Sequence, residues 1–113
     1  MLTIYHNPRC RKSRETLALI EESGIDVKII EYLKDVPSAE ELKDLINKLG
    51  ISAEKLLRKN EAIFKEQFKG KDLSEDEWIQ AMIEHPKLIE RPIVVKGSKA
   101  VLGRPPEHVK ELL

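Results

Sequence analysis

The sequence is short of cysteine and of net charge. It contains one cysteine among 113 residues, and its 20 Lys and Arg residues balance its 20 Asp and Glu residues. A single thiol excludes an internal disulfide and any metal site built from several cysteines. Balanced charge disfavours bulk electrostatic binding to nucleic acid or to an anionic membrane. Any strongly positive site must therefore be local.

Long apolar runs, repeats and low-complexity segments are also lacking. No run approaches the roughly 20 apolar residues that a membrane-spanning helix needs. The N-terminus leads straight into a strand-like run and a charged loop, without the pattern of a signal peptide. We therefore expect a soluble, cytoplasmic protein with no nucleic-acid or membrane partner. Its length suits one domain with a real core.

The segment 2–14 contains the one cysteine. Alternation over residues 2–5 predicts a strand, Asn7-Pro8 predicts a turn, and the following pattern predicts a helix over 12–23 that ends at Gly24. Cys10 lies between strand and helix, where the first helical N–H groups favour an anion. The cations around it are Arg9, Arg11, Lys12 and Arg14. A reactive thiolate beside an oxyanion site is the favoured interpretation; a buried structural cysteine is the alternative.

The rest of the chain predicts further strands and helices in a definite order. Residues 27–32 alternate like a second strand, which makes a parallel βαβ unit with the first strand and helix. Capping boxes at Ser38 and Ser74 begin amphipathic helices within a helical segment at about 38–86. Residues 93–96 and 99–102 predict a hairpin. A terminal helix from Pro105-Pro106 is expected to point three side chains inward: Val109, Leu112 and Leu113.

This order of elements predicts the fold class. A βαβ unit, a helical insertion and a ββα unit describe an α/β protein with a four-stranded mixed sheet. We predict a single thioredoxin-like domain over residues 1–113, with the helical insertion at about 38–86.

Five separated motifs occur in one order along the chain. They are YHNPRC at 5–10, LLRKN at 56–60, HP at 85–86, RPIVV at 91–95 and GRP at 103–105. Together they resemble the ArsC family of glutaredoxin-linked arsenate reductases, in its short YfgD-like branch. The resemblance covers essentially the whole chain and implies a thioredoxin-like fold.

The resemblance also implies roles for individual residues. Cys10 is implied to be the nucleophile that bonds to arsenic, and His6 to support its thiolate. The arginines implied to surround the oxyanion are Arg58, Arg91 and Arg104. The peptide bond before Pro92 is implied to be cis.

The chemistry of these residue types agrees with the implied roles. Guanidinium groups suit a compact tetrahedral anion better than ammonium groups do. Cys10 follows the first strand, Arg91 precedes the third and Arg104 ends the fourth, so these positions can converge at one end of the sheet. Arg58 must come from the helical insertion. Ser13 could cap the first helix while it hydrogen-bonds the thiolate.

The predicted function is a glutathione- and glutaredoxin-dependent arsenate reductase with no bound cofactor and no metal. Because the chain has no second cysteine, an external thiol must resolve the adduct on Cys10, and the resemblance implies glutathione with glutaredoxin. One alternative is an Spx-type regulator that binds RNA polymerase. Such proteins typically carry C-x-x-C, whereas this chain has Ser13 at the second position, and they generally lack an arginine matching Arg104. Another alternative is a glutathione-dependent oxidoreductase with a different substrate.

Overall fold

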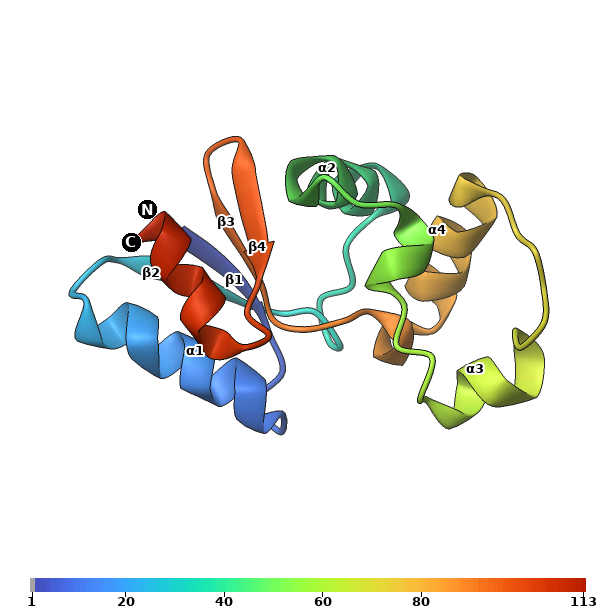
Figure 1. Ribbon diagram of the computed structural model, residues 1–113, viewed down its shortest axis with the longest axis horizontal. Coiled ribbons are helices and arrows are strands. Elements are labelled where there is room, and N and C mark those ends of the chain that lie inside the picture. The colour runs from blue at the N-terminus through green and yellow to red at the C-terminus, as the bar shows by residue number, and fades with distance from the viewer. Residues whose placement is uncertain (1) are drawn as a thin grey trace. The chain divides into compact units, whose positions relative to one another are not determined.

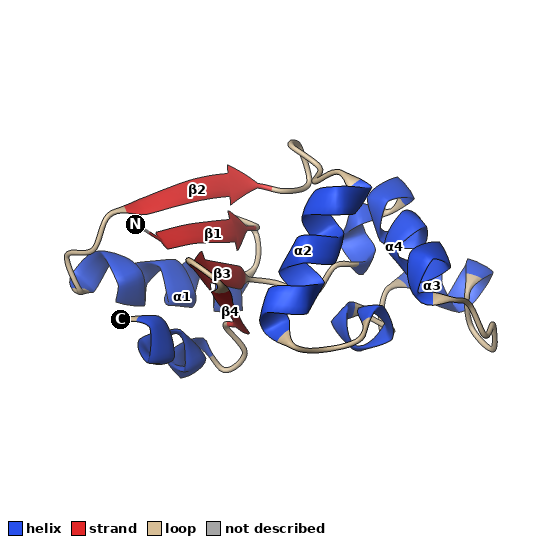
Figure 2. Ribbon diagram, turned by 90° about the horizontal axis from the view of Figure 1, so that it is seen from above, coloured by secondary structure: helices blue, strands red, loops and turns tan. Residues whose placement is uncertain are grey.

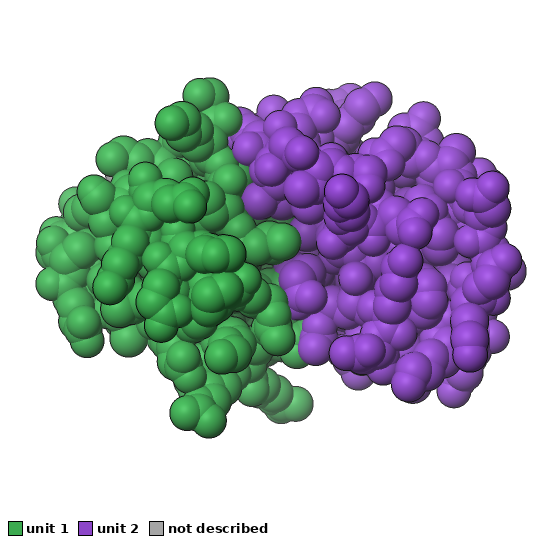
Figure 3. Space-filling model, in the orientation of Figure 1, with its two compact units in different colours: residues 1–35, 91–113 green, residues 36–90 purple. Residues whose placement is uncertain are grey.

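The computed structural model describes residues 2–113. In chain order the elements, with η marking 3₁₀-helices, are β1 (Leu2–His6), α1 (Arg11–Glu22), β2 (Val27–Glu31), α2 (Ala39–Leu49), η1 (Ala53–Leu56), α3 (Ala62–Gln67), α4 (Glu75–Glu84), η2 (Pro86–Leu88), β3 (Ile93–Lys96), β4 (Lys99–Leu102) and η3 (Pro106–Leu112). They form two compact units, coloured in Figure 3. The sheet unit holds the chain through residue 35 and residues 91–113, and the helical unit holds residues 36–90.

The sheet unit contains one mixed sheet with the strand order β2-β1-β3-β4 (Figure 1). β1 and β2 pair in parallel, with Ile4 opposite Ile29, as the predicted βαβ unit requires. β3 runs antiparallel to β1, with Val94 opposite Ile4, and β4 runs antiparallel to β3. Gly97 has a φ of 59°, which suits the tight turn between β3 and β4. The predicted α/β class and thioredoxin-like fold are confirmed.

One face of the sheet carries the core of this unit. Its six buried side chains come from β1, β3, α1 and η3: Leu2, Ile4, Ile20, Val94, Val109 and Leu112. Figure 2 shows α1 and the C-terminal helix on the same side of the strands. Full burial of one such aliphatic side chain stabilises the folded state by about 1.5–3 kcal/mol. This packing holds α1 and η3 against β1 and β3.

The C-terminal helix differs from the prediction in one respect. It is a 3₁₀-helix with three residues per turn, so Pro106, Val109 and Leu112 share the buried face. Leu113 follows this helix and is 37% exposed. The prediction that Leu113 points inward is therefore wrong, because it lies one step beyond the three-residue period.

The helical unit begins two of its helices with the predicted capping boxes, Ser38 with Glu41 and Ser74 with Glu77. Hydrogen bonding from Ser74 lowers the pKa of Glu77, because it stabilises the carboxylate. The unit extends somewhat beyond the predicted 38–86 segment. In the described part of the chain, no helix has both the length and the apolar character needed to cross a membrane. That the whole chain folds as a single domain stays a prediction.

Candidate functional site

Cys10 occupies the N-cap position of α1 and is 9% exposed. Its N–H donates to the carbonyl of Asn7 at 3.0 Å, and its own carbonyl accepts a hydrogen bond from the N–H of Arg14 at 3.0 Å. The N–H groups of the first helical turn have no acceptor within the helix. These dipoles stabilise a thiolate, or an anion bound beside it, at this place.

Arg104 reaches Cys10 from the chain that follows β4. Its Nη1 lies 4.0 Å from Sγ of Cys10, and it donates to the carbonyl of Arg91 at 3.4 Å. Sequence positions 10, 91 and 104 are thus brought to one end of the sheet, as the strand order predicted. The peptide bond before Pro92 is cis, as the resemblance implied, and that before Pro105 is cis as well.

Gly103 lets the segment before Arg104 pack closely on α1. Its N–H donates to the carbonyl of Pro92 at 2.9 Å, and its carbonyl accepts from Oγ1 of Thr16 at 3.3 Å. A Cβ atom at this position would lie 2.5 Å from Oγ1 of Thr16 and 2.8 Å from Cγ of Pro92. Sequence reasoning missed Gly103 and Thr16 as positioning residues. The one available signal was a glycine directly before the arginine of the GRP motif.

The hydroxyl of Ser13 joins the end of β1 to α1. Its Oγ lies 2.6 Å from Nδ1 of His6 and accepts from the N–H of Asn7 at 3.1 Å. Ser13 is fully buried and His6 is 6% exposed. Burial lowers the pKa of His6, and the nearby charge of Arg14 acts in the same direction, while Glu31 opposes it. In the neutral tautomer of His6 that carries its proton on Nε2, Nδ1 accepts the Ser13 O–H, which leaves Oγ to accept from the N–H of Asn7.

Ser13 does not cap α1, so that part of the prediction is wrong. The helix begins at Arg11, one residue earlier than predicted, and this makes Cys10 the N-cap. Ser13 then lies inside the first turn and faces β1, where its hydroxyl is shared between His6 and Asn7. Its supporting role, like that of His6, stays a prediction.

The loop between β1 and α1 is held by two further contacts that sequence reasoning missed. Oδ1 of Asn7 accepts from the N–H of Arg9 at 3.0 Å. Nη1 of Arg14 donates to the carbonyl of Pro8 at 3.0 Å. Asn7 and Arg14 therefore fix the backbone that leads into Cys10.

Arg58 belongs to the helical unit, between η1 and α3. Its guanidinium pairs with the carboxylates of Glu61 and Glu90 and is 17% exposed. The backbone N–H of Arg58 donates to the carbonyl of Leu88 at 2.7 Å, and the backbone N–H of Glu90 donates to the carbonyl of Leu56 at 2.8 Å. These bonds place residues 56–58 beside residues 88–90. Arg58 is thus a partly buried guanidinium in a fixed direction, and not a solvated charge at a helix end.

The sheet unit brings a thiol, the N-terminus of a helix and a guanidinium together at one place. Such a set can hold a small oxyanion against a sulfur nucleophile. Across residues 2–113, no group of three or more His, Cys, Asp or Glu side chains is arranged to hold a metal ion.

A comparison with protein families shows where the chain belongs. The model described as the ArsC family matches residues 5–112. The chain belongs to the ArsC family. Among the relatives of this chain, "Uncharacterized protein YfgD" of Escherichia coli (strain K12) is 50% identical to it over 112 residues, which are 97% of this chain and 94% of that protein. The arsenate reductase of Haemophilus influenzae is 48% identical over 112 residues, 97% of each chain.

A solved structure shows the same architecture. The arsenate reductase from Vibrio cholerae superposes with a TM-score of 0.95 at 53% identity and covers 99% of this chain and 97% of that one. The ArsC family match spans both units, so the helical unit is part of what the family shares.

Proposed function

We propose that this protein is an arsenate reductase in which Cys10 is the nucleophile. One observation carries the proposal: Sγ of Cys10, at the N-terminus of α1, lies 4.0 Å from a guanidinium nitrogen of Arg104 in an ArsC-family chain. Relatives that bear the name arsenate reductase, at 43% and 48% identity over nearly the whole chain, support the choice of substrate.

The proposed binding step places arsenate between the thiol and arginine side chains. Arsenate is a tetrahedral anion, and guanidinium groups bind such oxygens through paired N–H donors. We assign Arg104, Arg91 and Arg58 to this role. The first two lie in the sheet unit with Cys10, and Arg58 is held by its two carboxylate partners within the helical unit.

In the proposed reaction the Cys10 thiolate attacks arsenic. A sulfur–arsenic bond forms, an arsenic–oxygen bond breaks, and the oxygen leaves as water after protonation. An external thiolate then attacks Sγ, so a disulfide forms and the electron pair of the sulfur–arsenic bond stays on arsenic. Arsenic(V) thereby becomes arsenic(III) and leaves as arsenite. A second thiol attacks the mixed disulfide and restores Cys10.

We propose glutathione as the external thiol and glutaredoxin as the protein that helps to reduce the mixed disulfide. Both suit a cytoplasmic location, where the glutathione pool is reducing. A regulator of RNA polymerase is not favoured, because the position of a second C-x-x-C cysteine is held by Ser13, which is buried against His6. The chain therefore cannot form a C-x-x-C disulfide switch.

The test is a coupled assay of arsenate-dependent NADPH oxidation with glutathione reductase, glutathione and glutaredoxin. We expect turnover with the wild type and none with Cys10→Ser, while reactions without arsenate give the background rate. Full activity in Cys10→Ser would overturn the nucleophile assignment. Absence of turnover in a protein whose Cys10 is rapidly alkylated by iodoacetamide would show that the substrate is wrong.

A further inference from the structure

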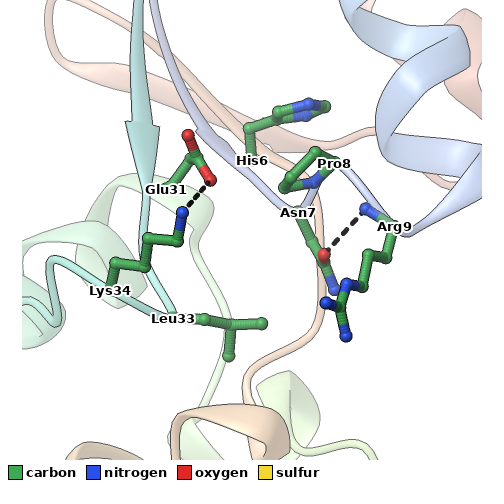
Figure 4. A pocket seen from close by; sticks show the side chains of 7 residues that line it. All are labelled: His6, Asn7, Pro8, Arg9, Glu31, Leu33 and Lys34. Carbon is green, nitrogen blue, oxygen red and sulfur yellow. Dashed lines mark hydrogen bonds and ion pairs between the residues drawn. The ribbon is translucent and has the colours of Figure 1, made fainter.

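A pocket of about 200 Å³ lies beside the loop that leads into Cys10 (Figure 4). One wall is the loop itself, residues 6–9, and the other is formed by Glu31, Leu33 and Lys34 after β2. All of these residues belong to the sheet unit. The pocket therefore adjoins the backbone that positions the thiol.

A tight turn holds the second wall. The N–H groups of Lys34 and Asp35 both donate to the carbonyl of Glu31, at 3.0 and 2.9 Å. Leu33 is 38% exposed, and Figure 4 shows its side chain extending toward the guanidinium of Arg9. The turn thus presents an apolar side chain and a lysine to the pocket.

The charges that border the pocket are two cations and one anion. Nζ of Lys34 lies 3.7 Å from Oε1 of Glu31, and these side chains are 82% and 44% exposed. Such a long, solvated pair is weak, so both groups remain able to bind a ligand. Among the residues that the structure describes, the side chain of Arg9 has no ion pair or hydrogen bond. Two carboxylates and one ammonium on a ligand would complement this set.

The chemistry at Cys10 calls for such a ligand. The chain has one cysteine, so the thiol that attacks Sγ must come from outside. Arg9, which lines the pocket, precedes Cys10 directly, and consecutive Cα atoms are about 3.8 Å apart. The lining of the pocket therefore ends one residue before Cys10.

We propose that this pocket binds the thiol co-substrate, a small peptide thiol with two carboxylates and one ammonium. Lys34 and Arg9 bind the carboxylates, Glu31 binds the ammonium, and Leu33 covers the aliphatic part. The bound thiolate attacks Sγ of Cys10, so that a disulfide forms and the sulfur–arsenic electron pair passes to arsenic. The attack on Sγ of Cys10 rests on the proposed function, whereas binding of the peptide thiol to the pocket can be measured separately.

The binding part is tested with S-methylglutathione, which has the required charges but no free thiol. Titration into ¹⁵N-labelled protein should shift the amide resonances of residues 6–9 and 31–34 in a saturable way. Lys34→Met and Glu31→Gln should each weaken binding about three- to fivefold, the value of one solvated ion pair. Lys28→Met, on an exposed position of β2, is the matched control and should bind like the wild type. Shifts confined to other residues, or binding insensitive to Lys34→Met, would overturn the proposal.

The catalytic part is tested by comparing glutathione with the neutral thiol 2-mercaptoethanol. Lys34→Met should raise the half-saturating concentration of glutathione about three- to fivefold relative to that of 2-mercaptoethanol. An unchanged ratio would overturn the proposal even if arsenate turnover depends on Cys10, and the proposed function would then stand alone. Binding that depends on Lys34 in a protein that does not reduce arsenate would support the pocket and contradict the arsenate assignment.

Discussion

Nη1 of Arg104 lies 4.0 Å from Sγ of Cys10, although the two residues are 94 positions apart in the sequence. The same nitrogen donates to the carbonyl of Arg91 at 3.4 Å, which fixes the direction of the guanidinium. A cation held in this way stabilises negative charge on the sulfur and on an oxyanion bound next to it. Arg104, which follows β4, thereby completes a site that begins with Cys10 in the loop after β1.

Replacement of Arg104 by Met should lower kcat/KM for arsenate by at least about tenfold. A hydrogen bond to a charged group contributes about 1.5–3 kcal/mol, and 1.4 kcal/mol corresponds to about tenfold. Arg104→Lys should recover only part of the loss, because an ammonium lacks the planar pair of donors. Initial rates in the coupled assay measure this, with Lys99→Met as the control for charge loss at an exposed position of the sheet unit. An Arg104→Met enzyme with wild-type kcat/KM would remove Arg104 from the site.

Gly103→Ala should destabilise the protein by about 1–3 kcal/mol, the usual cost of overpacking. The new Cβ would lie 2.5 Å from Oγ1 of Thr16 and 2.8 Å from Cγ of Pro92. Gly103→Ala should also lower arsenate turnover, because Arg104 is the next residue along the chain. Urea unfolding and initial rates test the two effects separately.

The double variant Gly103→Ala, Thr16→Ala tests whether the loss of stability in Gly103→Ala comes from steric overlap with the Thr16 side chain. Removal of the Thr16 side chain clears two of the three close contacts, so the double variant should be more stable than the sum of the two single changes predicts. Strict additivity would show that the packing against Thr16 is not the cause.

Ser13→Ala should cost about 1–3 kcal/mol of unfolding free energy, because it leaves the Asn7 N–H and His6 Nδ1 without their partner. Chemical denaturation measures the loss. Ser52→Ala is the matched control, since Ser52 is exposed and makes no side-chain hydrogen bond at its helix; such surface changes stay within about 0.5 kcal/mol. Equal stability of Ser13→Ala and Ser52→Ala would contradict the role of this hydroxyl.

The pH dependence of stability should carry a contribution from His6. Burial lowers its pKa in the folded state from 6.5, so the unfolded state binds the proton more readily. The free energy of unfolding should therefore rise with pH between the folded-state pKa and 6.5, and this contribution is lost as the pH falls through the folded-state pKa. Urea unfolding at several pH values measures the slope.

His6→Asn should have a smaller slope in this range, because the amide can still contact Ser13 but does not titrate. The matched control for loss of a histidine is His108→Gln, at an exposed position of η3. A slope that is the same in His6→Asn and in the wild type would assign the pH dependence to other groups.

Arg58→Met tests whether the helical unit contributes to arsenate binding. We expect kcat/KM for arsenate to fall about tenfold or more, because the proposed function places this guanidinium against the anion. The neighbouring Lys59, which pairs with Glu54 at the surface, is the control as Lys59→Met. Equal kinetic effects of the two variants would exclude a specific role for Arg58.

The order of elements was predictable from the sequence because each depends on local pattern. The capping boxes at Ser38 and Ser74 begin helices in the structure, and Gly97 turns the hairpin. The position of Cys10 between a strand and a helix also follows from adjacent residues alone. The motif order further indicated the ArsC family.

Other features depended on contacts between distant segments. Alternation and helical periodicity do not encode the distance from Arg104 to Cys10, the space at Gly103 or the partners of Ser13. The pocket between the loop 6–9 and the turn after β2 likewise forms only when β1 and β2 pair.

The sequence by itself thus determined the order of the strands and helices, the place of Cys10 between a strand and a helix, and the kinds of side chain at the site. The tertiary structure decided which of these side chains meet. Secondary structure follows from interactions within a few residues, whereas the direction of a side chain depends on what the packed core allows across the whole sheet.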